Sequence, residues 1–215
     1  MIASASVLLP GALAIATDVS VRACRATQRT LANHKSRSRS AVVQSESLGG
    51  LREGLRFDVV LVNPPYVPTP TEELWDSLKL LRVSGGGREG APGETETAAF
   101  TLTWAGGRDG AEMTRVMLRA GLRRLESETA EGRLYVIVVE ENNPEDLAAF
   151  ALREWDEIRA ERGGACAGLE WTIAVQTRAN NELLSVMRFV VVVGGGGGGG
   201  GGKVAEGDEE GCNPR

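Results

Sequence analysis

Histidine and cysteine are scarce in this 215-residue sequence, which excludes several classes of site. The single histidine, His34, cannot build a metal centre that needs several histidines. The three cysteines, Cys24, Cys166 and Cys212, show neither paired nor CxxC spacing, so we expect no disulfide framework and no metal site. No apolar run reaches the roughly 18 residues that a membrane-spanning helix needs. The segment 1–9 lacks the charged and apolar regions of a secretory signal, so we expect neither membrane insertion nor secretion.

The sequence also lacks an excess of positive charge. Its net charge is −5, whereas nucleic-acid-binding proteins generally carry a basic domain or stripe. Hydrophobic residues at 42% and charged residues at 25% are ordinary for a globular domain, so wholly disordered and fibrous chains are excluded. We therefore expect a protein of the reducing cytoplasm, with the nucleus as an alternative, and nucleic acid is a disfavoured partner.

Glycine is distributed unevenly and marks the limits of the folded part. A continuous run, Gly194–Gly202, is followed by an acidic end, and polyglycine has maximal backbone entropy and no side chain to bury. We therefore predict one domain over 1–193 and a flexible linker with a disordered tail over 194–215. Two insertions are expected to be flexible, KSRSRS at 35–40 and a glycine-rich loop at 83–98; a regulated basic patch is the alternative for the first.

Strand and helix patterns alternate along the domain and end in a hairpin. Apolar, β-branched runs predict strands at 12–17, 41–44, 57–62, 133–139, 169–177 and 182–193. Helices are predicted at 19–33, from a cap at Asp109 to about 127, and from Pro144, behind a cap at Asn143, to about 159. This order predicts an α/β sandwich whose last two strands form an antiparallel hairpin. Continuous apolar strands such as 57–62 are typical of parallel sheets covered on both faces.

The tetrapeptide Asn63-Pro64-Pro65-Tyr66 directly follows the predicted strand 57–62. In open α/β sheets, ligands bind beyond the carboxyl ends of the strands. The prolines fix φ and remove backbone donors, so the Asn63 side-chain oxygen and the Pro64 carbonyl offer two acceptors for a planar NH₂ group. Tyr66 can stack on that group, and catalysis would come from positioning and preorganised dipoles. The alternative is a proline-rich loop that only ends a strand.

The motif [N/D]-P-P-[Y/F/W] after a strand resembles the signature of amino-methylating class I methyltransferases. Four blocks, FDVVLVNPPYVPTPTEEL, TWAGGRDGAEM, LYVIVVEENNPEDL and NNELLSVMRF, occur in the order found in the eukaryotic branch of the HemK family. The resemblance covers about 10–193. It implies a Rossmann-like fold, the cofactor S-adenosyl-L-methionine, and methylation of the glutamine amide in the Gly-Gly-Gln motif of the class I translation release factor. It also implies a small zinc-binding activator subunit, which adds to the sheet edge next to the predicted strand 41–44.

The resemblance assigns substrate roles to the tetrapeptide and leaves other blocks to architecture. Asn63, Pro64 and Tyr66 match the catalytic substrate-amide pocket, Asn63 lies near the cofactor methyl group as well, and Pro65 keeps the loop rigid. The blocks at 104–110 and 141–144 are interpreted as loop and helix-start architecture.

The cofactor side of the resemblance is less complete. Asp18 matches the acidic residue that binds both ribose hydroxyls, although an aspartate after a strand also serves as a helix cap. Glu46 stands near the position of the family's adenine-contacting aspartate and is at best a substitute. No glycine-rich turn precedes Asp18 in the printed sequence. In the family's sheet order, 3-2-1-4-5-7-6, the absent first strand is central, so we expect a fragment that binds the cofactor weakly and whose strands at 12–17 and 57–62 lack their shared neighbour.

Three other functions remain open. An N6-adenine DNA methyltransferase would use the same pocket on a flipped base, but the sequence shows neither a recognition domain nor a basic surface. Lysine methylation is a further reported activity of the family. A remnant that no longer uses cofactor and only binds a partner is the non-enzymatic alternative.

Overall fold

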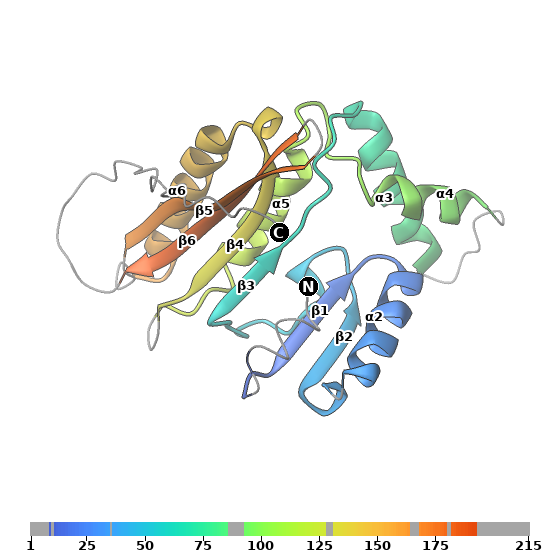
Figure 1. The fold of residues 1–215 in the computed structure, drawn as a ribbon, viewed down its shortest axis with the longest axis horizontal. Coiled ribbons are helices and arrows are strands. Elements are labelled where there is room, and N and C mark those ends of the chain that lie inside the picture. The colour runs from blue at the N-terminus through green and yellow to red at the C-terminus, as the bar shows by residue number, and fades with distance from the viewer. Residues whose placement is uncertain are drawn as a thin grey trace, which may run out of the picture. The chain divides into compact units, whose positions relative to one another are not determined.

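The computed structural model describes residues 9, 11–34, 36–85, 93–127, 131–163, 168–179 and 182–192. It divides into two compact units (Figure 1). The first comprises Met1–Arg56 with Pro65–Arg124, and the second comprises Phe57–Pro64 with Leu125–Arg215. The predicted linker and tail at 194–215 lie outside the described residues. None of the helices in the described part is both long and apolar enough to cross a membrane.

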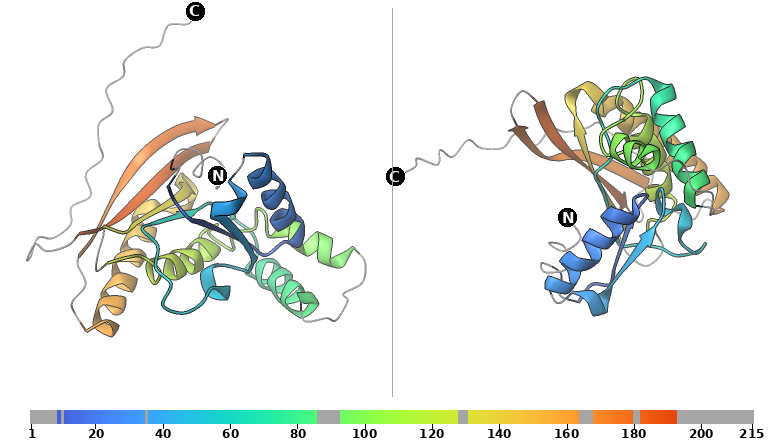
Figure 2. Two further views of the ribbon diagram at one scale, coloured as in Figure 1. Left: turned by 90° about the horizontal axis from the view of Figure 1, so that it is seen from below. Right: turned by 90° about the vertical axis from the view of Figure 1, so that its right-hand side faces the viewer.

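The first unit begins with a β-α-β element. Strand β1 (Ala14–Asp18) pairs in parallel with β2 (Ser40–Gln44), and helix α2 (Val21–Asn33) connects them. Helix α2 lies along this two-stranded sheet, as Figure 1 and Figure 2 show, and buries Cys24 and Leu31. Both strands and the helix were predicted, with ends that differ by one or two residues.

Three further helices complete the first unit: α3 (Thr71–Gly85), α4 (Glu94–Thr101) and α5 (Glu112–Leu122). A buried cluster of Leu74, Leu78, Ala105 and Met113 joins α3 to α5 and to the loop before it. Short 3-10 turns lie at Arg37–Arg39 and Leu48–Gly50.

Two predictions for this unit need correction. The loop predicted over 83–98 is shorter, because α3 continues to Gly85 and α4 begins at Glu94; 86–92 lie outside the described residues. The helix predicted from a cap at Asp109 to about 127 is shorter at both ends. It begins at Glu112, with Ala111 at the N-cap position, and it ends at Leu122, because Leu125 leaves the helical path and forms a parallel bridge with Phe57.

The second unit is a four-stranded mixed sheet with the order β3-β4-β6-β5. It contains β3 (Val59–Val62), β4 (Arg133–Val139), β5 (Gly168–Ala179) and β6 (Glu182–Val192), and α6 (Pro144–Glu161) follows β4. Strands β3 and β4 are parallel, and β6 is antiparallel to both β4 and β5, which confirms the predicted hairpin.

The core of the second unit follows from the alternation of β4 and β6. Leu134, Val136 and Val138 on β4 and Met187 and Phe189 on β6 are all fully buried. Helix α6 begins where the sequence predicted, since Pro144 is its first residue and the Asn143 side chain accepts a hydrogen bond from the Asp146 N–H at 3.3 Å. Its residues Leu147, Ala151, Trp155 and Ile158 are buried.

The strands of the described residues form two separate sheets. Among the described residues, β1 pairs with β2 alone and β3 pairs with β4 alone, so the two strands belong to separate sheets. Strand β3 was predicted to be buried on both faces, and this prediction is wrong. Val60 is buried, but Val59 and Leu61 are each 40% exposed. Among the described residues, β3 is an edge strand of its sheet.

Candidate functional site

The residues predicted to form the site are divided between the two units. Asn63 and Pro64 end the β3 segment in the second unit, while Pro65 and Tyr66 begin the second segment of the first unit. Asp18 and Glu46 also belong to the first unit. We therefore describe each part within its own unit.

The tetrapeptide changes from exposed to buried within one residue. Asn63, one residue beyond β3, is exposed, whereas Pro64 and Pro65 are buried and Tyr66 is half-buried. Buried prolines fix the backbone at this point, since their φ angles cannot vary and their rings are packed. The Asn63 amide is thus accessible on a rigid support at the carboxyl end of a strand.

Asp18 ends β1 with an exposed carboxylate. Its Oδ1 atom accepts a hydrogen bond of 2.8 Å from the Ser20 N–H, and Ser20 caps α2. The Asp18 carbonyl accepts a 2.9 Å bond from the Ser45 N–H, which places the loop after β2 beside it. Asp18 can therefore support the start of α2 and bind a ligand at the same time. The hydrogen bond from the Ser20 N–H occupies only one of its carboxylate oxygens, and its side chain remains accessible.

Cys24, on helix α2, contacts the backbone of Asp18. The Cys24 Sγ is 3.4 Å from the Asp18 carbonyl and the side chain is buried, as expected for a small core residue. Burial raises the pKa of the Cys24 thiol, and the negative charge of Asp18 raises it further. The thiol therefore stays protonated at neutral pH and acts as a packing group.

Glu46 lies in the loop that follows β2 and pairs with Arg82 in the last turn of α3. The Arg82 Nε is 2.6 Å from Oε2 and its Nη2 is 2.5 Å from Oε1, a two-bond arrangement. Bonding to Glu46 raises the pKa of the Arg82 guanidinium. Residues of this loop, of the ends of β1 and β2 and of the last turn of α3 line a pocket, so Glu46 stands at a cavity with its carboxylate already occupied.

The loop at this pocket has a fixed shape. The Ser45 Oγ accepts from the Gly50 N–H at 3.0 Å, and the Ser47 Oγ accepts from the Gly49 N–H at 3.3 Å. A Cβ atom on Gly50 would lie 2.6 Å from the Ser45 Oγ, so only glycine permits this approach. The Arg124 guanidinium also holds the end of this loop: it donates hydrogen bonds to the carbonyls of Arg52 at 2.5 Å and Leu51 at 3.1 Å.

Arg82 and Arg124 were not predicted from the sequence. Their partners lie 36 and about 72 residues away along the chain. A basic residue in the last turn of a helix is the one local signal for Arg82, and it commonly means only an interaction with the helix dipole.

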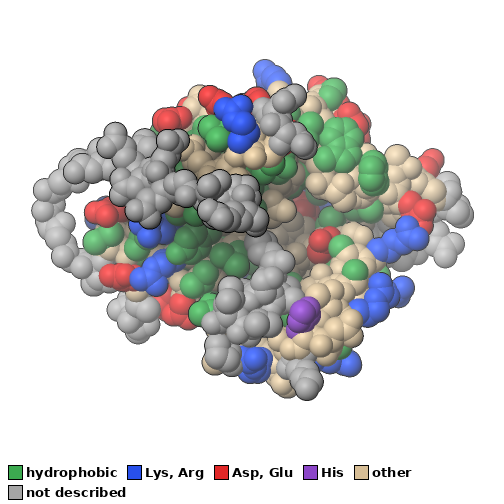
Figure 3. Space-filling model, in the orientation of Figure 1, with side chains coloured by type: hydrophobic (Ala, Val, Ile, Leu, Met, Phe, Trp, Pro, Cys, Tyr) green, Lys and Arg blue, Asp and Glu red, His purple; other side chains and the backbone are tan. Residues whose placement is uncertain are grey.

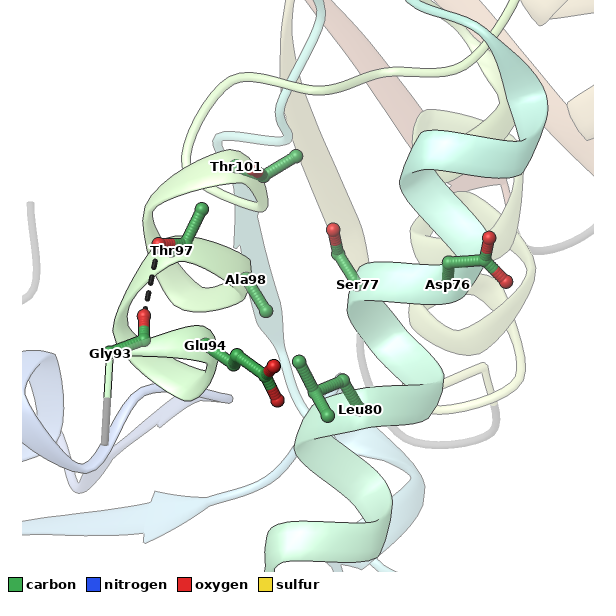
Figure 4. A pocket seen from close by; sticks show the side chains of 8 residues that line it. All are labelled: Asp76, Ser77, Leu80, Gly93, Glu94, Thr97, Ala98 and Thr101. Atoms are coloured by element: carbon green, nitrogen blue, oxygen red, sulfur yellow. Dashed lines mark hydrogen bonds between the residues drawn. The ribbon is translucent and has the colours of Figure 1, made fainter. Parts of the chain in front are cut away.

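A second pocket lies between α3 and α4 (Figure 4). Asp76, Ser77 and Leu80 line it from α3, and Glu94 and Ala98 line it from α4. None of the residues predicted for substrate or cofactor lines it. Within the described part of the chain, no three His, Cys, Asp or Glu side chains gather as a metal site would require.

Comparison with known proteins gives relatives over most of the chain, although no family model matches it. Methyltransferase HEMK2 of Mus musculus is 30% identical over 187 residues, covering 86% of this chain and 69% of that protein, and the Homo sapiens protein is 29% identical over the same shares. The eRF1 methyltransferase catalytic subunit mtq2 of Schizosaccharomyces pombe is 26% identical over 177 residues, 80% of this chain and 62% of that protein. The chain thus spans between three fifths and seven tenths of the length of these relatives.

Among solved structures, an E. cuniculi Mtq2–Trm112 complex that methylates the termination factor eRF1 aligns with 89% of this chain and 93% of that chain. Its TM-score is 0.41 and its sequence identity is 17%. The sequence relatives therefore provide the stronger comparison.

Proposed function

This chain belongs to the HEMK2 family of methyltransferases, and from that premise we propose that it is an S-adenosylmethionine-dependent N-methyltransferase acting on the glutamine amide of a class I translation release factor. The observation that carries the proposal is the exposed Asn63 on the buried Pro64-Pro65 support beyond β3. A small zinc-binding activator subunit is the proposed partner, added at the edge of β2. The proposed location is the cytoplasm, with the nucleus as an alternative.

In this function the residues of the tetrapeptide orient the glutamine amide toward the methyl donor. The Asn63 amide oxygen and the Pro64 carbonyl each accept a hydrogen bond from one N–H group of the glutamine amide. Tyr66 covers the flat face of that amide. Amide nitrogen is a poor nucleophile because its lone pair is delocalised, so two acceptors that hold the N–H groups favour a localised lone pair directed at the methyl donor. Catalysis then rests on fixed dipoles and alignment, with no strong base.

The residues present fit the cofactor in part. Asp18 offers an exposed carboxylate to the ribose hydroxyls, and its backbone bond to Ser20 leaves that carboxylate accessible. Glu46 fits less well as an adenine contact, because Arg82 occupies both of its oxygens. When bound, S-adenosylmethionine would supply the electrophilic methyl group; Asp18 is the residue of this chain proposed to hold it.

A methylation assay tests the proposal. The full-length protein and its activator are incubated with radiolabelled S-adenosylmethionine and release factor, and mass spectrometry locates the label. We expect label on the glutamine of Gly-Gly-Gln, lost in Asn63→Ala by a factor of about 100 or more, the size of effect seen when one preorganised dipole is removed. Asn33→Ala, an exposed asparagine at the end of α2, is the matched control and should methylate normally.

The other functions are separate outcomes of the same assay. Label on a lysine or on adenine in DNA would replace the glutamine assignment. On the face viewed in Figure 3, both acidic and basic side chains are present, and the net charge of −5 does not favour the DNA reading. No label, with activator binding retained, would leave a partner-binding role alone.

A further inference from the structure

The segment that follows the tetrapeptide is bound along the loop of the TWAGGRDGAEM block. The Val67 N–H donates to the Trp104 carbonyl at 2.9 Å, and the Val67 carbonyl accepts from the Gly106 N–H at 2.8 Å. The Thr69 N–H donates to the Gly107 carbonyl at 2.8 Å, and the Thr69 Oγ1 accepts from the Gly107 N–H at 3.1 Å. The block therefore holds this segment by a short ladder on alternate residues.

Glu112, the first residue of α5, ties the end of this segment to two other elements. Its Oε1 accepts from the Thr71 hydroxyl at 2.6 Å and from the Arg108 N–H at 3.3 Å. Its Oε2 accepts from the Trp75 Nε1–H at 3.2 Å. One carboxylate thus connects the first turn of α3, the loop before α5 and α5 itself.

The backbone is shaped to admit this carboxylate. Gly107 has φ +88°, which favours glycine, and a Cβ atom there would lie 2.6 Å from the Glu112 Cδ. The Glu112 N–H donates to the Gly106 carbonyl at 2.9 Å, so both ends of the residue are held against the same loop.

The charge state of Glu112 agrees with this arrangement. Burial raises the pKa of its carboxyl, but the bonds from Thr71, the Arg108 N–H and Trp75 outweigh that effect and hold the pKa below its usual value. The group is therefore ionised at neutral pH, and a carboxylate accepts several bonds at once, as three donors from three segments require.

We infer that Glu112 is a positioning residue of the methyltransferase site: by anchoring Thr71 and Trp75 to the ladder loop, it fixes the segment from Val67 onward and thereby the place of Tyr66. This inference rests on the proposed function, since it matters only if Tyr66 covers the substrate amide. The carboxylate does not contact substrate; it acts through the four residues that separate Tyr66 from Thr71.

Replacement by glutamine tests the role closely. The Glu112→Gln substitution keeps the size of the side chain and one acceptor oxygen, but it places an NH₂ group facing a donor where the second oxygen stood. Thr71→Val removes a single donor and should have an intermediate effect. Glu73→Gln, an exposed residue on the first turn of α3, is the matched control for loss of one charge.

The full-length protein with its activator is assayed for release-factor methylation. We expect Glu112→Gln to lower kcat/KM for the release factor by about 10- to 100-fold, the size of effect that a displacement near 1 Å produces. Its Kd for S-adenosylmethionine should change by less than about twofold, and the Trp75 indole N–H resonance, assigned with Trp75→Phe, should shift. A merely structural role would instead lower cofactor affinity and substrate turnover together.

The outcomes separate the inference from the proposed function. An active wild type with an unaffected Glu112→Gln variant, or with equal losses of turnover and cofactor affinity, overturns the positioning role alone. A wild-type protein that methylates no release factor overturns the proposed function and this role with it.

Discussion

Arg82 binds Glu46 through two of its guanidinium nitrogens, at 2.5 and 2.6 Å, at the edge of the pocket beside β1 and β2. The pair joins the last turn of α3 to the loop after β2. Such a two-bond geometry directs a carboxylate toward its arginine partner. Of the two acidic residues predicted to bind cofactor, Glu46 is therefore engaged within the protein, whereas Asp18 has one backbone bond on an exposed side chain.

This difference predicts unequal effects on cofactor binding. Asp18→Asn should raise the Kd for S-adenosylmethionine about tenfold or more, because hydrogen bonds to a charged group contribute about 1.5–3 kcal/mol. The substitution keeps the oxygen that accepts from Ser20, so the start of α2 should remain stable. Glu46→Gln should change the Kd by less than about threefold. Calorimetry on the full-length protein measures both values.

Equal losses in the two variants would show that Glu46 leaves Arg82 to contact the cofactor. The melting temperature of Asp18→Asn is the control, since a fall there would mean that the cap and not the ligand contact was lost.

The loop at the same pocket predicts a contrast between neighbouring glycines. Gly50→Ala places a Cβ atom 2.6 Å from the Ser45 Oγ, and relieving such a contact costs about 1–3 kcal/mol of unfolding free energy. Gly49→Ala meets only the Ser47 Oγ at 3.8 Å and should stay within about 0.5 kcal/mol of the wild type. Urea denaturation of both variants compares the two costs, and equal stabilities would contradict the packing of this loop.

Elements with a strong local pattern were predicted well. Strand β4 has the predicted bounds, 133–139, because its apolar run is bounded by polar residues. Helix α6 begins at Pro144, since a proline favours the first helical position and Asn143 tolerates the left-handed φ of +52° found there. The hairpin of β5 and β6 follows from two apolar runs separated by turn residues.

Elements that depend on tertiary contacts were not predicted. Helices α3 and α4 flank a glycine-rich stretch, and α4 contains threonines that favour no helix by themselves; its buried Ala98 and Thr101 depend on packing. The tetrapeptide with its exposed Asn63 was located from the sequence, but Arg82, Arg124 and Glu112 were not, because each is defined by partners more than 30 residues away. Distant pairings of this kind leave no periodic signal.

Glu112 predicts a specific dependence of stability on pH. Its pKa in the folded protein lies below that of an unfolded glutamate, about 4.3. The stabilisation from the ionised group is therefore fully present above the unfolded value and is lost as the pH falls through the lower folded value. The difference in unfolding free energy between the wild type and Glu112→Gln should be constant from about pH 7 to 5.5 and shrink below about pH 5. Urea denaturation at several pH values measures it, with Thr71→Val expected to show a smaller change because two of the three donors remain; a difference that does not vary with pH would contradict the ionised anchor.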